Sequence, residues 1–127
     1  MRRSACLLVG FVLLSVGTAG AADSGIRGRI VAGPTCPVQS VPPAPGCAPR
    51  PLRATLRIRR VGSRGPSTRV RSAADGRFRV RLGPGTYIVQ ALAPAGVALP
   101  RPPPASRVQV HAGRYTFVRI AYDTGIR

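Results

Sequence analysis

Short runs of alternating apolar and polar residues dominate this chain, and glycine and proline separate the runs. In one of them, Leu56 and Ile58 fall on one side of an extended backbone, while Arg57 and Arg59 fall on the other. Beyond the first 21 residues, no segment keeps a helical period of 3.6 for more than a turn or two. This pattern is typical of all-β proteins, whose short strands each bury one face.

The runs define seven expected strands and two loops. The strands are residues 26–32, 52–61, 67–73, 77–82, 86–93, 107–111 and 114–122, and the proline-rich loops are residues 33–51 and 94–104. Seven short strands with regular turn signals predict an antiparallel, immunoglobulin-like β-sandwich. We expect residues 22–127 to form this single domain, and we expect the domain to be a monomer.

The amino-terminal segment 1–21 predicts export. A positive start at Arg2 and Arg3 precedes an apolar stretch at 6–16 that is too short for a stable membrane anchor. Small residues at 18–22 then fit a cleavage site, as in a secretory signal peptide. An uncleaved anchor helix is the alternative interpretation. No second long apolar run follows, so we expect no transmembrane segment after cleavage. The expected location is secreted, periplasmic or in the cell envelope.

Two cysteines remain after cleavage, Cys36 and Cys47. In an exported chain such a pair is predicted to form a disulfide. A zinc site is the other option, but zinc needs four ligands, or three and a water molecule. Two cysteines and one histidine in the mature chain are too few ligands for such a site. The sequence therefore predicts no metal and no other cofactor.

The charge of the chain is strongly positive, with a formal net charge of +17. Every basic residue is arginine, and the acidic residues are only Asp23, Asp75 and Asp123. Such a field attracts phosphate-rich polymers, acidic glycans or anionic lipid headgroups. A proteome biased toward arginine as its solvated residue would also explain the missing lysine, though it would not explain the missing acids. Both interpretations stay open at this point.

Residues 67–73 and 77–82 are predicted to form a hairpin through the loop Ala74-Asp75-Gly76, because this register places Val70 opposite Val80 on a buried face. Arg71 would then face Arg79, and Arg69 would face Arg81, on the outer face. Guanidinium groups bind phosphate and carboxylate in bidentate fashion. A solvated face screened by salt is the alternative. The candidate anion-binding residues are Arg57, Arg59, Arg69, Arg71, Arg79 and Arg81.

Catalytic patterns are weak in this sequence. His111 and Asp123 with a serine are the only conceivable triad, and His111 lies near a strand end, where it is expected to be exposed. Three scattered aspartates do not suit acid–base catalysis. Tyr115 and Phe117 share one strand face, but nucleic-acid binding needs more interleaved aromatic residues than this. We therefore do not expect nucleic acid as a partner of this exported chain, and we expect no enzyme activity.

Two linked motifs resemble a known family. Asp75-Gly76-Arg77-Phe78 and then Leu82-Gly83-Pro84-Gly85-Thr86-Tyr87 are similar to the D-G-x-F and L-x-P-G-x-Y core of carboxypeptidase regulatory-like domains. An early Gly28-Arg29-Ile30 strand and a late Val108-Gln109-Val110 strand are also similar, so the resemblance covers most of residues 26–121. It implies a transthyretin-like (prealbumin-like) β-sandwich of a small exported bacterial kind. It also implies a non-catalytic accessory or adhesion-like role.

Together these observations predict an exported, non-catalytic β-sandwich that acts as a binding or interaction module. Its candidate surfaces are the arginine face and the two proline-rich loops. The alternative is a purely electrostatic binder of anionic polymers or lipid headgroups. The expected partner is an unidentified protein or an anionic polymer of the envelope.

Overall fold

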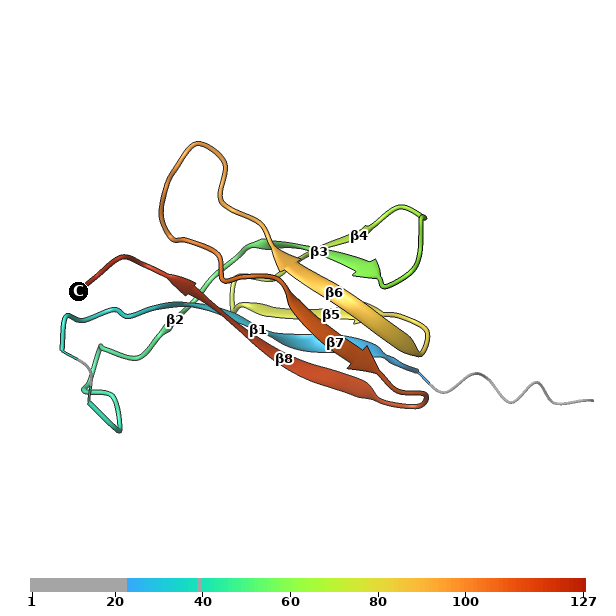
Figure 1. Ribbon diagram of the computed structural model, residues 1–127. Helices are drawn as coiled ribbons and strands as arrows, with labels where there is room; N and C mark the ends of the chain where they lie inside the picture. The colour runs from blue at the N-terminus through green and yellow to red at the C-terminus, as the bar shows by residue number, and fades with distance from the viewer. Residues whose placement is uncertain (1–22, 39) are drawn as a thin grey trace, which may run out of the picture.

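A computed structural model describes residues 23–38 and 40–127, so the expected signal peptide 1–21 lies outside the described residues. The described chain is an all-β sandwich of two sheets (Figure 1). Its strands are β1 (Gly25–Gly33), β2 (Arg50–Pro51), β3 (Thr55–Arg60), β4 (Thr68–Arg71), β5 (Arg77–Arg81), β6 (Gly85–Ala91), β7 (Ser106–Val110) and β8 (Tyr115–Asp123). The predicted fold class is confirmed, and each of the seven expected strands is present. Only the short strand β2 was not expected, because it lies inside the predicted loop 33–51.

Sheet A is built around β1. The strand β8 lies along one side of β1, and β5 and then β2 lie along the other side. The β1–β8 pair is parallel over its whole length, from Gly25 beside Tyr115 to Gly33 beside Asp123. The prediction of an antiparallel sandwich therefore needs one correction. The direction of β8 is set by the crossing from β7 in the other sheet, and alternation along a strand carries no information about that crossing.

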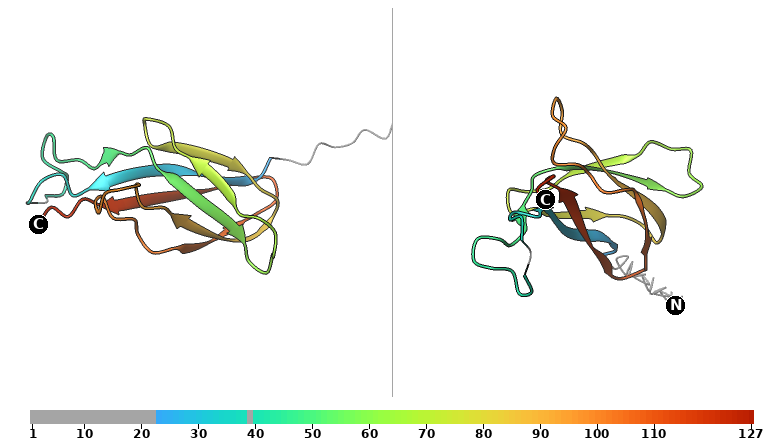
Figure 2. Two further views of the ribbon diagram at one scale, coloured as in Figure 1. Left: turned by 90° about the horizontal axis from the view of Figure 1, so that it is seen from above. Right: turned by 60° about the vertical axis from the view of Figure 1, so that its left-hand side comes forward.

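Sheet B has the strand order β4-β3-β6-β7, and all its pairs are antiparallel. The two sheets form the two layers of strands in Figure 2, and the apolar sides of both sheets meet in one core. Its largest fully buried side chains are Ile26, Ile30, Leu56, Ile58, Val89 and Tyr122. The predicted alternation is thus confirmed: apolar side chains point inward and arginines point outward on the same strands.

The predicted hairpin of residues 67–82 is wrong. The strand β4 pairs with β3 in sheet B, whereas β5 pairs with β1 in sheet A. The turn itself is present, because the Ala73 N–H donates to the Arg77 carbonyl at 2.9 Å and Gly76 has φ of 79°. Beyond the turn, the two strands diverge into different sheets. Val70 and Val80 still both pack against the core. The alternation of buried and exposed residues therefore fits a corner between facing sheets as well as it fits a hairpin.

Both proline-rich loops extend from the same end of the sandwich as the carboxyl terminus (Figure 1). The predicted disulfide between Cys36 and Cys47 is present in the first loop. The carboxyl-terminal segment connects the two loops, since the Thr124 N–H donates to the Gly33 carbonyl at 3.1 Å and the Arg101 N–H donates to the Asp123 carbonyl at 2.7 Å. The loops therefore form one end of the domain, and the strand faces are left open.

Candidate functional site

The outer side of sheet A carries a dense set of arginines, which we call the sheet A face. Along β1, β5 and β8, exposed residues alternate with buried ones, so every second side chain points away from the core. The sheet A face consists of the six arginines Arg27, Arg29, Arg77, Arg79, Arg81 and Arg119 together with Tyr115 and Phe117. No sequence pattern connected the residues of one strand with those of the other two, because the three strands are distant along the chain.

Strand register arranges the sheet A face in rows that run across the sheet. In one row, Arg29 of β1 lies between Arg77 of β5 and Arg119 of β8. In the next, Arg27 lies between Arg79 and Phe117. Neighbouring strands are about 4.8 Å apart, and successive rows are about 6.8 Å apart. Like charges directly opposite each other destabilise a sheet, so these rows store unfavourable electrostatic energy that a bound anion would relieve.

One arginine of this face is held on an aromatic ring. The guanidinium carbon of Arg79 lies 3.9 Å from the centroid of the Tyr115 ring. The two residues lie on β5 and β8, and the β1 position beside Tyr115 is Gly25. A Cβ at Gly25 would be 2.9 Å from the Tyr115 Cε1 atom, so the missing side chain makes room for the ring. The stack orients Arg79 and leaves the N–H edge of its guanidinium group available for an anion.

A second aromatic ring on the same face is open to solvent. Phe117 is 57% exposed, and the guanidinium carbon of Arg27 lies 5.6 Å from its centroid. Beside this ring lies an open depression of about 620 Å³, lined by Arg27, Gly28, Arg29, Arg77, Phe78, Arg79 and Phe117. The depression thus combines guanidinium groups with an exposed apolar ring. The sequence showed Tyr115 and Phe117 on one strand face, but their arginine neighbours depend on the sheet pairing.

The outer side of sheet B is a second arginine surface, which we call the sheet B face. Its register pairs Arg57 with Arg69 across β3 and β4, and it places Arg59 beside Ile88, which pairs with Arg107 of β7. A smaller depression of about 340 Å³ lies there, lined by Arg57, Arg59, Gly65, Ser67, Ile88 and Gln90. The arginines of the sheet B face are Arg57, Arg59, Arg69, Arg71 and Arg107, and no aromatic residue lines this depression.

The structure therefore divides the six predicted anion-binding arginines between two opposite faces. Four of them, Arg57, Arg59, Arg69 and Arg71, lie together on the sheet B face. The other two, Arg79 and Arg81, lie on the sheet A face. The expected pairs of Arg71 with Arg79 and of Arg69 with Arg81 do not exist, because the hairpin that would have formed them is a corner between sheets.

Each of the three aspartates of the chain is already paired with an arginine. Asp23 contacts Arg81 at 2.9 Å, and Asp75 contacts Arg77 at 3.8 Å. Asp123 contacts Arg127 at 2.8 Å, next to the carboxyl terminus. Within residues 23–38 and 40–127, the remaining arginines of both faces have no carboxylate side chain as a partner. Their positive charge is available to an anion from outside the chain.

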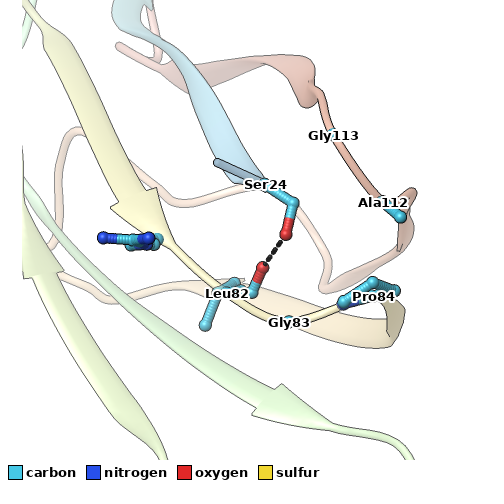
Figure 3. A pocket seen from close by; sticks show the side chains of 7 residues that line it. Ser24, Leu82, Gly83, Pro84, Ala112 and Gly113 are labelled. Carbon is cyan, nitrogen blue, oxygen red and sulfur yellow. Dashed lines mark hydrogen bonds between the residues drawn. The ribbon is translucent and has the colours of Figure 1, made fainter. Parts of the chain in front are cut away.

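Other parts of the described chain offer less chemistry. A pocket of about 330 Å³ lies beside the start of β1, where the Ser24 hydroxyl already donates to the Leu82 carbonyl at 2.7 Å (Figure 3). His111 is exposed, as expected. Residues 23–38 and 40–127 contain no group of three or more histidine, cysteine or acidic residues placed to hold a metal ion, and no helix among them is long and apolar enough to cross a membrane.

The loop end of the sandwich differs in character from the strand faces. It exposes apolar side chains, with Val38 and Val41 in the disulfide loop and Val97 and Leu99 in the second loop. Leu99 also lies against the carboxyl-terminal segment, since a Cβ at Gly125 would be 2.8 Å from its Cδ1 atom. The loop end therefore exposes several apolar side chains, whereas the six arginines of the predicted charged surface lie on strands.

Comparison with known proteins supports the fold and leaves the family open. No protein-family model matches the chain, and no curated protein sequence matches it. Among solved structures, a minor pilin of Streptococcus agalactiae, GBS52, matches with a TM-score of 0.58 and 13% identity over 82% of this chain and 46% of that one. The TIE protein of Bacillus anthracis matches with a TM-score of 0.53 and 16% identity over 82% of this chain and 17% of that one.

This chain therefore spans less than half the length of either neighbour. At such low identity the likeness shows a shared β-sandwich fold and nothing more. The resemblance to carboxypeptidase regulatory-like domains is not confirmed by these matches and stays a prediction.

Proposed function

We propose that this chain is an exported, non-catalytic binding module of the cell envelope or extracellular space, and that its ligands are anionic polymers. The observation that carries the proposal is the arrangement of charge on the sandwich. Arginines cover the outer sides of both sheets, while all three aspartates are paired with arginines. One of the fold neighbours is a minor pilin, which favours a surface role.

Folding alone does not require this arrangement of charge. Like charges directly opposite each other in a sheet are unfavourable, and uncharged polar side chains would solvate the outer faces equally well. A polymer with repeated negative charges would neutralise neighbouring rows at once. Its binding would release counterions, so the affinity would fall steeply as the salt concentration rises.

A retention experiment tests this proposal. The purified chain is passed over carboxylated, phosphorylated and neutral matrices in a series of salt concentrations. We expect retention on both anionic matrices, loss of retention as salt rises, and no retention on the neutral matrix. Binding to the neutral matrix with no dependence on salt would contradict an electrostatic mechanism.

A comparison of two variants with equal net charge distinguishes binding by a particular surface from an effect of overall charge. One variant replaces Arg27, Arg59 and Arg69, which lie on the two faces, with threonine. The control replaces Arg64, Arg101 and Arg114, which are exposed but belong to neither face, so the two variants have the same net charge. The face variant is expected to elute at clearly lower salt than the control. Equal elution would mean that net charge alone determines retention, and the proposal of a binding surface would be wrong.

Export is tested separately. We expect the protein recovered from outside the cytoplasm to begin at about residue 22, and its intact mass measures this. A mass that retains residues 1–21 would favour the anchor-helix interpretation of that segment.

A further inference from the structure

We propose that the sheet A face is a binding site for an acidic polysaccharide, in which Phe117 contacts a sugar ring while the neighbouring arginines bind its carboxylates. This inference rests on the proposed function and narrows it to one face and one class of ligand. Sheet pairing alone brings its residues together, because they lie on strands that begin at residues 25, 77 and 115.

An exposed aromatic ring lies beside guanidinium groups on this face. Phe117 lies in the same row as Arg27 and Arg79, and the residue is 57% exposed although it lies within β8. A large apolar ring in that position gains nothing from a purely ionic ligand. The flat C–H face of a pyranose ring can pack on it, while the acid group of the same sugar reaches a guanidinium group nearby.

One guanidinium group of the sheet A face is already oriented. Arg79 is stacked on Tyr115 at 3.9 Å, so its guanidinium group loses less conformational entropy when it binds an anion than a free arginine would. A planar guanidinium group binds a carboxylate through two parallel N–H bonds. On the same face, Arg27, Arg29 and Arg119 have no carboxylate partner within the part of the chain that the structure describes.

The aromatic content of the sheet A face favours an acidic polysaccharide over other polyanions. Polyphosphate has no apolar surface, so it would not use Phe117. Single-stranded nucleic acid binds through several rings on which successive bases stack. On this face Tyr115 is already covered by Arg79, and Phe117 is the ring left open to a ligand. One open ring among several guanidinium groups suits a polymer in which each unit has one apolar face and one acid group.

The key experiment changes no charge. The affinity of the purified chain for polygalacturonate and for polyphosphate is measured at one salt concentration, for the natural sequence and for Phe117→Thr. We expect the variant to bind polygalacturonate about fivefold more weakly and polyphosphate with unchanged affinity. Phe117→Tyr keeps the ring and is expected to keep the affinity for polygalacturonate. Because Phe117 is exposed and threonine favours strands, both variants are expected to fold, which circular dichroism verifies.

A second pair of variants tests the choice of face. Replacing Arg27, Arg29 and Arg119 with threonine removes three charges from the sheet A face. Replacing Arg59, Arg69 and Arg107 removes three from the sheet B face. We expect the first variant to lose at least about tenfold more affinity for polygalacturonate than the second, because a local site depends on its own contacts rather than on the overall field. Fully methyl-esterified polygalacturonate keeps the sugar and loses the charge, and we expect it to bind neither the natural protein nor the variants.

Each contrary result has a definite meaning. Equal affinity of Phe117→Thr for polygalacturonate would overturn the sugar contact, yet the proposed anionic module would stand if the arginine variants still bind more weakly. Equal losses from the two faces would overturn the assignment to sheet A. Tighter binding of single-stranded DNA than of polygalacturonate, with the same dependence on Phe117, would overturn the choice of polysaccharide.

Discussion

Arg79 and Tyr115 lie on strands that are not neighbours, and the guanidinium carbon of Arg79 is nevertheless 3.9 Å from the centroid of the Tyr115 ring. The strand between them carries Gly25 beside Tyr115, and the absence of a side chain there makes room for the ring. This contact converts one arginine of a crowded row into an oriented group. It also joins β5 to β8 across the outer side of β1.

A double-mutant cycle measures the strength of this contact. Arg79→Gln, Tyr115→Leu and the combined variant are unfolded in urea, and we expect a coupling free energy of about 0.5–1 kcal/mol. A control cycle uses Arg77 in place of Arg79, since Arg77 makes no ring contact with Tyr115. The control is expected to show a coupling near zero. Equal couplings in the two cycles would mean that the ring stack contributes nothing of its own.

Ser72 is a buried polar residue at the corner between the sheets. It is 3% exposed, its hydroxyl donates to the Leu52 carbonyl at 2.8 Å, and it accepts the Ala54 N–H at 2.9 Å. Ser72→Ala leaves both backbone groups without this partner, so we expect the free energy of unfolding to fall by about 1–3 kcal/mol. The exposed Ser106 on β7 provides the control, and Ser106→Ala is expected to change stability little. A neutral Ser72→Ala would show that the two groups find other partners.

Gly76 combines a left-handed backbone with a close approach. Its φ is 79°, and a Cβ there would be 2.2 Å from the Ile30 carbonyl oxygen. Gly62 has the same φ with no atom near its Cβ position. We expect Gly62→Ala to cost about 1 kcal/mol from conformation alone and Gly76→Ala to cost about 3 kcal/mol or more, because the clash adds to it. Equal costs in thermal or urea unfolding would contradict the close packing of this corner against β1.

The Cys36–Cys47 disulfide closes a loop with a sequence separation of 11. Replacing both cysteines with serine restores the entropy of that loop to the unfolded chain and is expected to lower the free energy of unfolding by about 2–3 kcal/mol. Urea unfolding of the oxidised protein and of the double variant gives the difference. Binding to anionic polymers is expected to persist in the folded variant, because both arginine faces lie on the strands. Loss of that binding would point to the loop as part of the site.

Asp123 makes stability depend on acid pH. A hydrogen bond from the Arg127 side chain, and then one from the Gly125 N–H, hold the pKa of Asp123 well below its ordinary value of about 4. Because the pKa of Asp123 is lower in the folded state than in the unfolded state, ionised Asp123 stabilises the fold at pH values above the ordinary pKa. This contribution is lost as the pH falls from the ordinary pKa toward the lower pKa of the folded state. Urea midpoints at pH 7 and pH 3 are therefore expected to differ less for Asp123→Asn than for the natural sequence. Arg127→Gln, which removes the largest cause, is expected to behave in the same way. An unchanged pH dependence in both variants would contradict this assignment.

Several features were predictable because they depend on local chemistry. Alternation along 52–61 showed correctly that Leu56 and Ile58 point inward and that Arg57 and Arg59 point outward. Glycine at position 76 indicated a turn, and its positive φ confirms that prediction. The pairing of the only two cysteines expected in the mature chain followed from their number and the predicted compartment, and it is confirmed.

The candidate site was predictable only in part. Outward arginines were identified strand by strand, but their grouping rested on a hairpin that does not form. Arg27, Arg29 and Arg119 were missed, because β1 and β8 pair residues about 90 positions apart and no local signal relates the two strands. Arg77 was missed although it has the same strand and the same outward parity as Arg79 and Arg81.

The sequence by itself determined which side of each strand is buried, because a side-chain period of 2 is a property of the extended backbone. It also determined the excess of positive charge, which composition alone sets. Only the tertiary structure decided which strands are neighbours. The inner faces of both sheets share one core, so the same alternation of buried and exposed residues results whether two strands form a hairpin or lie in facing sheets. That pairing placed Phe117 and Tyr115 beside arginines, and so it selected the sheet A face as a mixed aromatic and cationic surface.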